Sequence, residues 1–187
     1  MMYNNKNYVE PVILVDETNT PIGLCEKATV HYANTPLHRG FSIFLFNDAG
    51  EVLLQQRSLI KITWPGVWSN TCCGHPLPDE SIKSAAIRRL QYELGITVAA
   101  QDITMVFPDY RYKAEREGVV ENEFCPVMIV RHNSQPKIND TEVMATQWLH
   151  WTEFLSDTHN FNNFTPWCQE EARLLSKDAK FNSFIIN

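Results

Sequence analysis

The sequence predicts a mixed α/β or α+β fold, because strand patterns precede, separate and follow its helical patterns. Short apolar runs bounded by turn residues occur in both halves of the chain, and an amphipathic helical pattern lies between them. The 187 residues, 44% of them hydrophobic and 20% charged, are typical of a globular protein. Since no repeat, low-complexity tract or long linker divides them, we expect a single domain over residues 1–187.

The first predicted elements are strands. The runs VILVDET (12–18) and FSIFLFN (41–47) favour β-structure, and the NDAGE turn joins the second run to VLLQQR (52–57) as a hairpin. The segment WPGVWSNTCCGHP, residues 64–76, is expected to form a loop.

The pattern after this loop predicts a helix over residues 82–94. Ser81 suits the N-cap position and Gly95 the left-handed C-cap. At about 100° per residue, five apolar side chains fall on one arc. These are Ile82, Ala86, Ile87, Leu90 and Leu94.

Further strands and a second helix complete the expected fold. The strands lie around residues 105–106, 110–113, 123–130 and 146–149. The helix over residues 166–176 closes the chain, with Thr165 as its N-cap and Pro166 at its first position.

Charge and cysteine usage narrow the functional classes. Broad nucleic-acid binding needs clustered Lys and Arg, so the net charge of −6 argues against it, although a local basic pocket for a small anion is compatible with it. The cysteines are odd in number, scattered and without C-x-x-C spacing, which argues against a disulfide framework or cysteine-bound zinc. They are Cys25, Cys72, Cys73, Cys125 and Cys168.

The N-terminal MMYNNKNYVEPV lacks the apolar stretch of a signal peptide, and no run approaches the ~18 apolar residues of a membrane span. We therefore expect a cytoplasmic monomer with reduced thiols, which binds neither nucleic acid nor membrane.

Two groups of carboxylates fall where apolar side chains are expected. Glu93 lies inside the apolar arc of the first helix, and either an ion pair with Arg89 or a bound cation accounts for it. Glu121 and Glu123 are two residues apart on a strand, so they share one face. Either an edge strand exposes both to solvent, or a divalent cation lies between them.

Three histidines sharpen this choice. His31 and His38 flank YANTPL, whose Pro36 makes one continuous helix unfavourable, and His75 lies in the loop. Each alone is typical of a hydrogen-bonded or surface histidine, but with the carboxylate pair they form an N/O ligand set for Zn, Mn or Mg. The other histidines, His132, His150 and His159, are assigned to the surface or hydrogen-bonded class.

The segment from Gly74 to Ile96 resembles the Nudix box. The positions that fit are Gly74, Glu80, Arg88, Leu90, Glu93, Gly95 and Ile96. Arg89 and Tyr92 stand where the box has glutamates, and Nudix hydrolases use this glutamate cluster to hold Mg²⁺ ions and activate water on a diphosphate.

The altered box is similar to that of the type 1 isopentenyl-diphosphate delta-isomerases. So are LCEKATVHYANTPLHRGFS, WPGVWSNTCCGHP, PDYRYKA, ENEFCPV, INDTEVM and FTPW, and the similarity spans residues 12–167. The resemblance implies a Nudix-type α/β/α sandwich with a central mixed β-sheet. It also implies an isomerase that converts isopentenyl diphosphate to dimethylallyl diphosphate, in isoprenoid biosynthesis, by protonation and deprotonation.

The resemblance also implies roles for individual residues. One divalent metal, Zn²⁺, Mn²⁺ or Mg²⁺, would be bound by His31, His38, His75, Glu121 and Glu123. Glu93 would help hold a Mg²⁺ delivered with the substrate diphosphate. The diphosphate itself would bind Lys27, Arg57, Lys61 and Arg89.

Cys73 matches the catalytic thiol of that family, and Glu123, with Tyr112 beside it, matches the acid on the other side; either of the two can deliver the proton. Trp167 matches a tryptophan that covers the isoprenoid tail. Trp64 and Trp68 are expected to pack in the core.

The adjacent cysteines are expected to differ in role. Neighbouring side chains of an extended segment point to opposite sides, so only one of Cys72 and Cys73 faces the cavity. Cys73 precedes Gly74 and lies two residues from His75, and nearby positive charge would favour its thiolate. Cys72 is expected to pack as a small apolar side chain.

Two other functions are compatible with parts of the sequence but are less favoured than the isomerase. A Nudix hydrolase of a nucleotide or other diphosphate is disfavoured by Arg89 and Tyr92, and a phosphate-release assay separates the two activities. A Nudix-like binding module without turnover would need no proton donors on opposite faces of its cavity.

Overall fold

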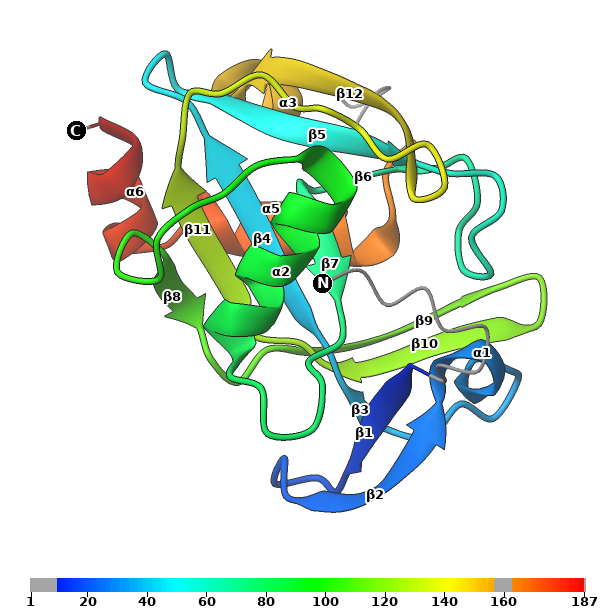
Figure 1. Cartoon of the computed structure of the whole chain (residues 1–187). Coiled ribbons are helices and arrows are strands. Elements are labelled where there is room, and N and C mark those ends of the chain that lie inside the picture. Colours follow the sequence, from blue (N-terminus) through cyan, green and yellow to red (C-terminus); the bar gives the residue numbers. More distant parts are fainter. Residues whose placement is uncertain (1–9, 157–162, 187) are drawn as a thin grey trace.

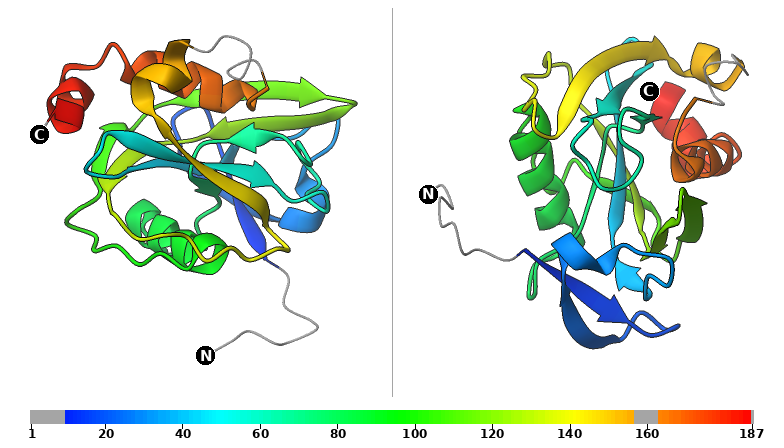
Figure 2. Two further views of the ribbon diagram at one scale, coloured as in Figure 1. Left: turned by 90° about the horizontal axis from the view of Figure 1, so that it is seen from above. Right: turned by 90° about the vertical axis from the view of Figure 1, so that its right-hand side faces the viewer.

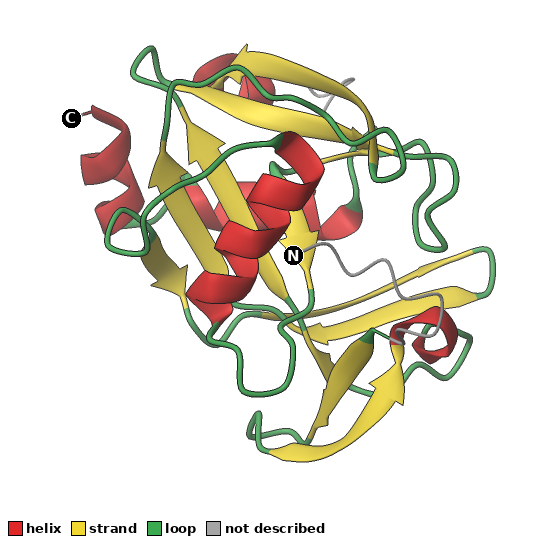
Figure 3. Ribbon diagram, in the orientation of Figure 1, coloured by secondary structure: helices red, strands yellow, loops and turns green. Residues whose placement is uncertain are grey.

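The structure is a computed structural model that describes residues 10–156 and 163–186. Its strands are β1 (Pro11–Val15), β2 (Pro21–Glu26), β3 (His38–Arg39), β4 (Phe41–Phe46), β5 (Glu51–Arg57), β6 (Trp68–Ser69), β7 (Cys72–Gly74), β8 (Thr104–Phe107), β9 (Arg111–Arg116), β10 (Val119–Phe124), β11 (Val127–Arg131) and β12 (Val143–His150). Its helices are α1 (Lys27–Val30), α2 (Ile82–Leu94), α3 (Trp151–Ser156), α5 (Pro166–Leu175) and α6 (Ala179–Ile186). Figure 3 shows how they are distributed.

The larger sheet forms the centre of the molecule. Its strand order is β12-β5-β4-β11-β8, with β6 paired to β5 and β7 paired to β4. The pairing of β4 with β11 is parallel and the other pairings are antiparallel, so the sheet is mixed. Helix α2 covers one face, and α3, α5 and α6 lie on the other (Figures 1 and 2). The expected α/β/α sandwich with a mixed sheet is therefore confirmed.

Strand β4 shows why the sheet is covered on both faces. Every one of its residues is buried. Ile43 and Leu45 pack in the cluster that contains Leu90 of α2, whereas Phe44 and Phe46 pack in the cluster that contains α3, α5 and α6. An apolar run without polar alternation is typical of a strand between two helical layers.

Helix α2 begins and ends where the sequence predicts. The Ser81 side chain accepts a hydrogen bond from the Ser84 N–H at 3.1 Å, and Gly95 has the left-handed conformation, with φ of 65°. Ala86, Leu90 and Leu94 are buried. The capping residues and the apolar arc thus determine this element locally.

The smaller sheet, of order β2-β1-β3-β10-β9, corrects one prediction. The expected strand over residues 123–130 is wrong, because β10 ends at Phe124 in the smaller sheet and β11 begins at Val127 in the central sheet. Pro126 lies between them and has no N–H to donate to a sheet. The chain therefore crosses between the sheets at this point.

The ends of other elements also differ from expectation. The strand expected over residues 12–18 stops at Val15, because the Asp16 carboxylate accepts hydrogen bonds from the N–H groups of Thr18 and Thr20 and forms a turn. Helix α5 does not close the chain, since α6 follows it. Thr165 is the N-cap residue of α5, but its hydroxyl hydrogen-bonds Ser69 Oγ at 2.9 Å rather than the helix.

Among the described residues, no helix has the length and apolar character needed to cross a membrane.

Candidate active site

A cavity of about 350 Å³ opens where residues of both sheets, α1, α2 and α5 converge. Eleven of the predicted site residues line it: Lys27, His31, Arg57, Lys61, Cys73, His75, Arg89, Tyr112, Glu121, Glu123 and Trp167. The other two, His38 and Glu93, are fully buried behind its wall. The structure therefore brings together segments that are far apart in the sequence.

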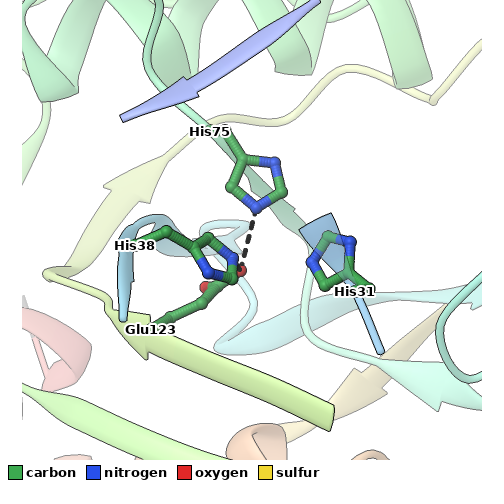
Figure 4. A group of neighbouring side chains, drawn as sticks. All are labelled: His31, His38, His75 and Glu123. Carbon is green, nitrogen blue, oxygen red and sulfur yellow. Dashed lines mark hydrogen bonds and ion pairs between the residues drawn. The ribbon is translucent and has the colours of Figure 1, made fainter. Parts of the chain in front are cut away.

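Three imidazoles and a carboxylate converge on one another (Figure 4), and three of these four side chains line the cavity. One ligand atom from each of His31, His38, His75 and Glu123 lies within 4.8 Å of the others. The ring centroids of the three histidines are 5.1, 5.2 and 5.7 Å apart. This is a compact N/O donor set of the kind that binds a divalent metal.

Backbone pairing builds this cluster. The parallel pair of β3 and β10 places His38 opposite Glu123. Next to His38 in the chain, a Cβ on Gly40 would lie 2.1 Å from Glu123 Oε2, so only glycine leaves room for the carboxylate. His31 follows the short helix α1, which ends well before Pro36, as the sequence predicts.

The unpaired polar atoms of this cluster fit a metal ion. His38 Nδ1 donates to the Pro36 carbonyl at 2.9 Å, which leaves Nε2 with a free lone pair. His38 Nε2, His31 Nε2 and Glu121 Oε2 are buried without a hydrogen-bond partner among the described residues. His31 Nε2 and Glu121 Oε2 are 3.0 Å apart, so Glu121 adds a second carboxylate to the set.

The electrostatics of the cluster also suit a cation. Burial lowers the pKa of His75 to about 4, in spite of the carboxylate of Glu123. Burial opposes ionisation of Glu123, but the neighbouring imidazoles of His38 and His75 outweigh it and hold the Glu123 pKa well below its usual range. At neutral pH His75 is uncharged and Glu123 is anionic, which are the states that bind metals.

The two adjacent cysteines face opposite sides of strand β7, as expected. Cys72 is fully buried among the side chains that pack against α2, whereas Cys73 lines the cavity. All five cysteines are free thiols. The inference that only Cys73 is available to a ligand is consistent with this geometry.

The expectation that Cys73 favours its thiolate is wrong. Burial raises the pKa of the Cys73 thiol, and the carboxylates of Glu171 and Glu123 add to this effect. Arg57 acts in the opposite direction but is weaker. Cys73 Sγ lies 3.1 Å from Asn70 Oδ1, so the protonated thiol has an acceptor for its hydrogen.

Tyr112, Glu123 and Trp167 form another wall of the cavity. Tyr112 pairs with Glu123 across the β9–β10 ladder, and its ring centroid lies 5.3 Å from that of Trp167. Burial raises the pKa of Tyr112 well above its usual value. The Arg57 guanidinium lies 5.6 Å from the centre of the Trp167 ring. Trp64 also packs against Trp167, which agrees with its expected core position.

The predicted diphosphate ligands form the cationic end of the cavity, and three of the four have carboxylate partners. Lys27 Nζ is 2.9 Å from Glu10 Oε2. Arg89 Nη2 is 3.1 Å from Glu142 Oε2, and Lys61 donates to the same carboxylate. Arg57 differs, because its Nε and Nη2 groups donate to the Thr63 carbonyl at 3.0 and 2.7 Å.

The structure decides between the alternatives that the sequence left open for Glu93 and for the Glu121/Glu123 pair. Arg89 Nε and Nη2 donate to Glu93 Oε1 at 2.9 and 2.6 Å, so the ion pair exists, while Glu93 Oε2 is buried without a hydrogen-bond partner among the described residues. The solvent-exposed edge strand is wrong for Glu121 and Glu123, because both are buried and β10 lies between β3 and β9.

Two of the other three histidines do not belong to the metal-ligand cluster. His150 is exposed and its Nδ1 contacts Thr152 Oγ1, and His132 is half-buried, so neither belongs to the cluster. Trp68 is half-buried and packs against the core. His159 lies outside the described residues.

Sequence reasoning missed several polar residues at the cavity, and three of them contact predicted site residues, directly or through Ser42. Glu142 lines it, and Ser42 and Glu171 are buried behind Cys73. Glu142 lies in the INDTEVM motif but received no role. Glu171 is a carboxylate on the buried face of α5, which is the same signal that singled out Glu93 on α2.

Comparison with known proteins adds independent information. Residues 36–168 match the family model of the NUDIX domain. The isopentenyl-diphosphate Delta-isomerase of Saccharopolyspora erythraea is 46% identical over 165 residues, which cover 87% of this chain and 84% of the relative. The isopentenyl-diphosphate Delta-isomerase of Mycolicibacterium vanbaalenii is 44% identical over 167 residues, 89% of this chain and 91% of the relative.

Solved structures agree on the fold. DR0079 from Deinococcus radiodurans has a TM-score of 0.69 at 18% identity and covers 88% of this chain and 98% of its own. The MutT protein from Methanosarcina mazei has a TM-score of 0.59 at 20% identity and covers 76% of this chain and 97% of its own. At these identities the likeness concerns the fold alone.

Proposed function

The chain belongs to the Nudix family, among its isopentenyl-diphosphate Delta-isomerases, and on this premise we propose that Cys73 and Glu123 carry out its two proton transfers. The reaction converts isopentenyl diphosphate to dimethylallyl diphosphate. The observation that carries the proposal is that Cys73 and the Glu123–Tyr112 pair line one cavity together with the cationic side chains.

The reaction needs two groups on opposite sides of the five-carbon unit. One adds a proton to the terminal methylene carbon, the other removes a proton two carbons away, and the double bond shifts between them while the diphosphate stays intact. Because the reverse reaction interchanges the roles, each group is the donor in one direction and the acceptor in the other. The protonated Cys73 and the anionic Glu123 of the free protein are complementary states for such a pair.

The cavity protects the positive charge that develops between the two transfers. Trp167 and Tyr112 offer aromatic faces there, and the indole is 2% exposed. An indole face stabilises a nearby cation, and exclusion of water prevents its capture. We therefore assign Trp167 to the five-carbon tail, and Tyr112 to holding a proton beside Glu123.

The metal ligands in this proposal are His31, His38, His75, Glu121 and Glu123. A divalent cation bound there supplies positive charge that offsets the repulsion between the two buried carboxylates. The imidazole and carboxylate donors suit Zn²⁺, Mn²⁺ or Mg²⁺. The free Oε2 of Glu93 is the atom that we assign to a Mg²⁺ arriving with the diphosphate.

We assign the diphosphate to Lys27, Arg57, Lys61 and Arg89, which line the cavity. In the free protein the Glu142 carboxylate pairs with both Lys61 and Arg89. A diphosphate oxygen offers these cations a similar acceptor, so we expect the ligand to replace Glu142 as their partner. The Arg89 position, where Nudix hydrolases carry a glutamate, thus serves binding of the diphosphate rather than its hydrolysis.

The cellular context remains part of the proposal. We propose that residues 1–187 act as one domain and as a cytoplasmic monomer whose partner is its small-molecule substrate. The net charge of −6 supports the absence of nucleic-acid binding, because broad binding to nucleic acid needs an excess of clustered Lys and Arg.

Analysis of the reaction product tests both the isomerase activity and the assignment of Cys73, rather than Cys72, as the catalytic thiol. NMR of isopentenyl diphosphate incubated with the protein and Mg²⁺ should show dimethylallyl diphosphate without release of phosphate. Cys73→Ala should lower kcat by about 10³-fold or more, as expected when a proton-transfer group is removed. Cys72→Ala is the matched control and should keep most activity. The opposite ranking, in variants with matching circular dichroism, would reject Cys73.

A further inference from the structure

Glu171 is a buried carboxyl group that the proposed reaction does not use. It lies on the inner face of α5 and is 0% exposed. Oε2 lies 2.6 Å from Ser42 Oγ, at hydrogen-bond distance, whereas Oε1 is buried without a hydrogen-bond partner among the described residues. Burial raises the pKa of Glu171 well above its usual value. A buried carboxyl with so few partners is costly, which calls for a reason other than stability.

A short hydrogen-bonded path leads from Glu171 to Cys73. Ser42 is paired with Cys73 in the β4–β7 register, and their Oγ and Sγ atoms are 3.8 Å apart. Asn70 bridges the same two residues, because Nδ2 donates to Ser42 Oγ at 2.8 Å and Oδ1 lies 3.1 Å from Cys73 Sγ. The path therefore reaches the sulfur from the side chains behind the cavity.

The orientation of Asn70 is determined by its other contacts. Nδ2 also lies 3.1 Å from the carbonyl oxygens of Ile43 and Cys72, which accept only from an N–H group. Oδ1 accepts in addition from Ser69 Oγ at 2.9 Å. Asn70 thus offers Cys73 an acceptor, and the only donor that reaches the sulfur along this path is the Ser42 hydroxyl.

The protonation state of Glu171 decides where that hydroxyl points. Ser42 has one proton, and an ionised Glu171 would take it as a hydrogen bond. A neutral Glu171 donates its own proton to Ser42 Oγ instead, which frees the Ser42 hydrogen to point at Cys73 Sγ. In that arrangement the sulfur has a donor ready for the negative charge that it carries after giving up its proton.

We propose that Glu171 is a positioning residue that acts as a neutral acid through Ser42 and directs the serine hydrogen to Cys73 Sγ. No proton leaves Ser42, since it only donates a hydrogen bond while the thiol proton moves to or from the substrate. This inference rests on the proposed role of Cys73 in the isomerisation.

Two substitutions at Glu171 test the inference. The amide of Glu171→Gln can still donate to Ser42, so kcat should stay within about threefold of wild type, whereas Glu171→Met should lose about tenfold in kcat with KM unchanged. Glu170→Gln, on the same helix but contacting Tyr110, is the control and should change neither constant. An unchanged kcat in Glu171→Met, or equal losses in the Gln and Met variants, would overturn the inference.

Ser42→Ala gives an independent test that does not depend on the folding of Glu171→Met. Its kcat should fall about as much as that of Glu171→Met, and the double variant should fall no further, because both changes break one path. Losses that multiply in the double variant would show that the two residues act separately and would overturn the inference.

The infrared S–H band of Cys73 separates this inference from the proposed function. The band is assigned as the one that disappears in Cys73→Ala. It should shift in Glu171→Met and Ser42→Ala and keep its wild-type position in Glu171→Gln. An unshifted band in both Glu171→Met and Ser42→Ala would overturn the coupling. If Cys73→Ala instead kept full isomerase activity, the proposed function would fail while the band still reported on Glu171.

Discussion

The two ends of the cavity differ in how their polar groups are satisfied. At the histidine end, His31 Nε2, His38 Nε2 and Glu121 Oε2 are buried without hydrogen-bond partners among the described residues. At the cationic end, Lys61 and Arg89 both contact the Glu142 carboxylate. The first end is arranged for an added cation, whereas at the second the protein itself supplies a carboxylate partner for these two cations. Binding at the two ends should therefore respond in opposite ways to the removal of a carboxylate.

The difference has a physical basis in the chain. The histidine end is built by backbone pairing, since β3 and β10 place His38 against Glu123 and Gly40 leaves space for the carboxylate. The cationic end is built from long side chains, such as Lys61, whose ammonium group is on a flexible stem. Rigid donors are suited to holding one ion, and flexible cations are suited to exchanging one anionic partner for another.

The largest expected effect is at the histidine end. His38→Ala and Glu121→Gln each remove a metal ligand from the cluster. The affinity for the metal should therefore fall by more than about 100-fold, and isomerase activity should fall in parallel. Elemental analysis of the purified variants measures the loss, and circular dichroism checks the fold. His150→Ala, at an exposed histidine, is the control. Full occupancy in both cluster variants would mean that these residues are not the ligands.

A smaller effect on metal affinity is expected from Gly40→Ala, which crowds the histidine end of the cavity but removes no metal ligand. In Gly40→Ala the new methyl group would lie 2.1 Å from Glu123 Oε2, so the carboxylate must move. Metal affinity should fall by about 10- to 100-fold while the chain remains folded. Gly23→Ala is a matched control, because its Cβ would meet only Leu14, at 4.0 Å. Equal metal affinity in the two variants would contradict the rigid arrangement of this end.

At the cationic end, removal of a carboxylate should improve binding. Glu142→Gln frees Lys61 and Arg89 from a competing negative charge, so the KM for isopentenyl diphosphate should fall by about threefold. Steady-state kinetics at constant ionic strength measures this change. Glu80→Gln alters a carboxylate that pairs with Arg88 outside the cavity and should leave KM unchanged. A higher KM in Glu142→Gln would show that Glu142 helps to bind the substrate rather than competing with it.

The smallest effect concerns stability in acid. Burial opposes ionisation of Glu142, but Arg89 and Lys61 outweigh it and lower its pKa from 4.5 to about 2. A lowered pKa in the folded state means that the ionised group stabilises the fold above pH 4.5 and that this contribution is lost as the pH falls to about 2.

Urea unfolding of wild type and Glu142→Gln measures this contribution. The difference in unfolding free energy between the two should be constant from pH 7 to 5 and should shrink as the pH falls toward 2. A difference that stays constant over the whole range would show that the ion pairs of Glu142 contribute nothing to the folded state.

Several features of this protein follow from the sequence by itself, because they depend on residues a few positions apart. The caps of α2 and its apolar arc are local, and so is the two-residue spacing that turns Glu121 and Glu123 to one side and Cys72 and Cys73 to opposite sides. The resemblance of the loop and helix motifs to the isomerases also named eleven of the residues that line the cavity, including Lys27 and Trp167.

Only the tertiary structure decided which charges meet and how deeply they are buried. The break at Pro126 sends β10 and β11 into different sheets, although the sequence runs on as one apolar stretch. Ser42 and Glu171 are 129 positions apart, and no local pattern predicts their contact. Cys73 keeps its proton because burial outweighs the nearby positive charge, and the extent of burial is a property of the packed chain rather than of any short segment.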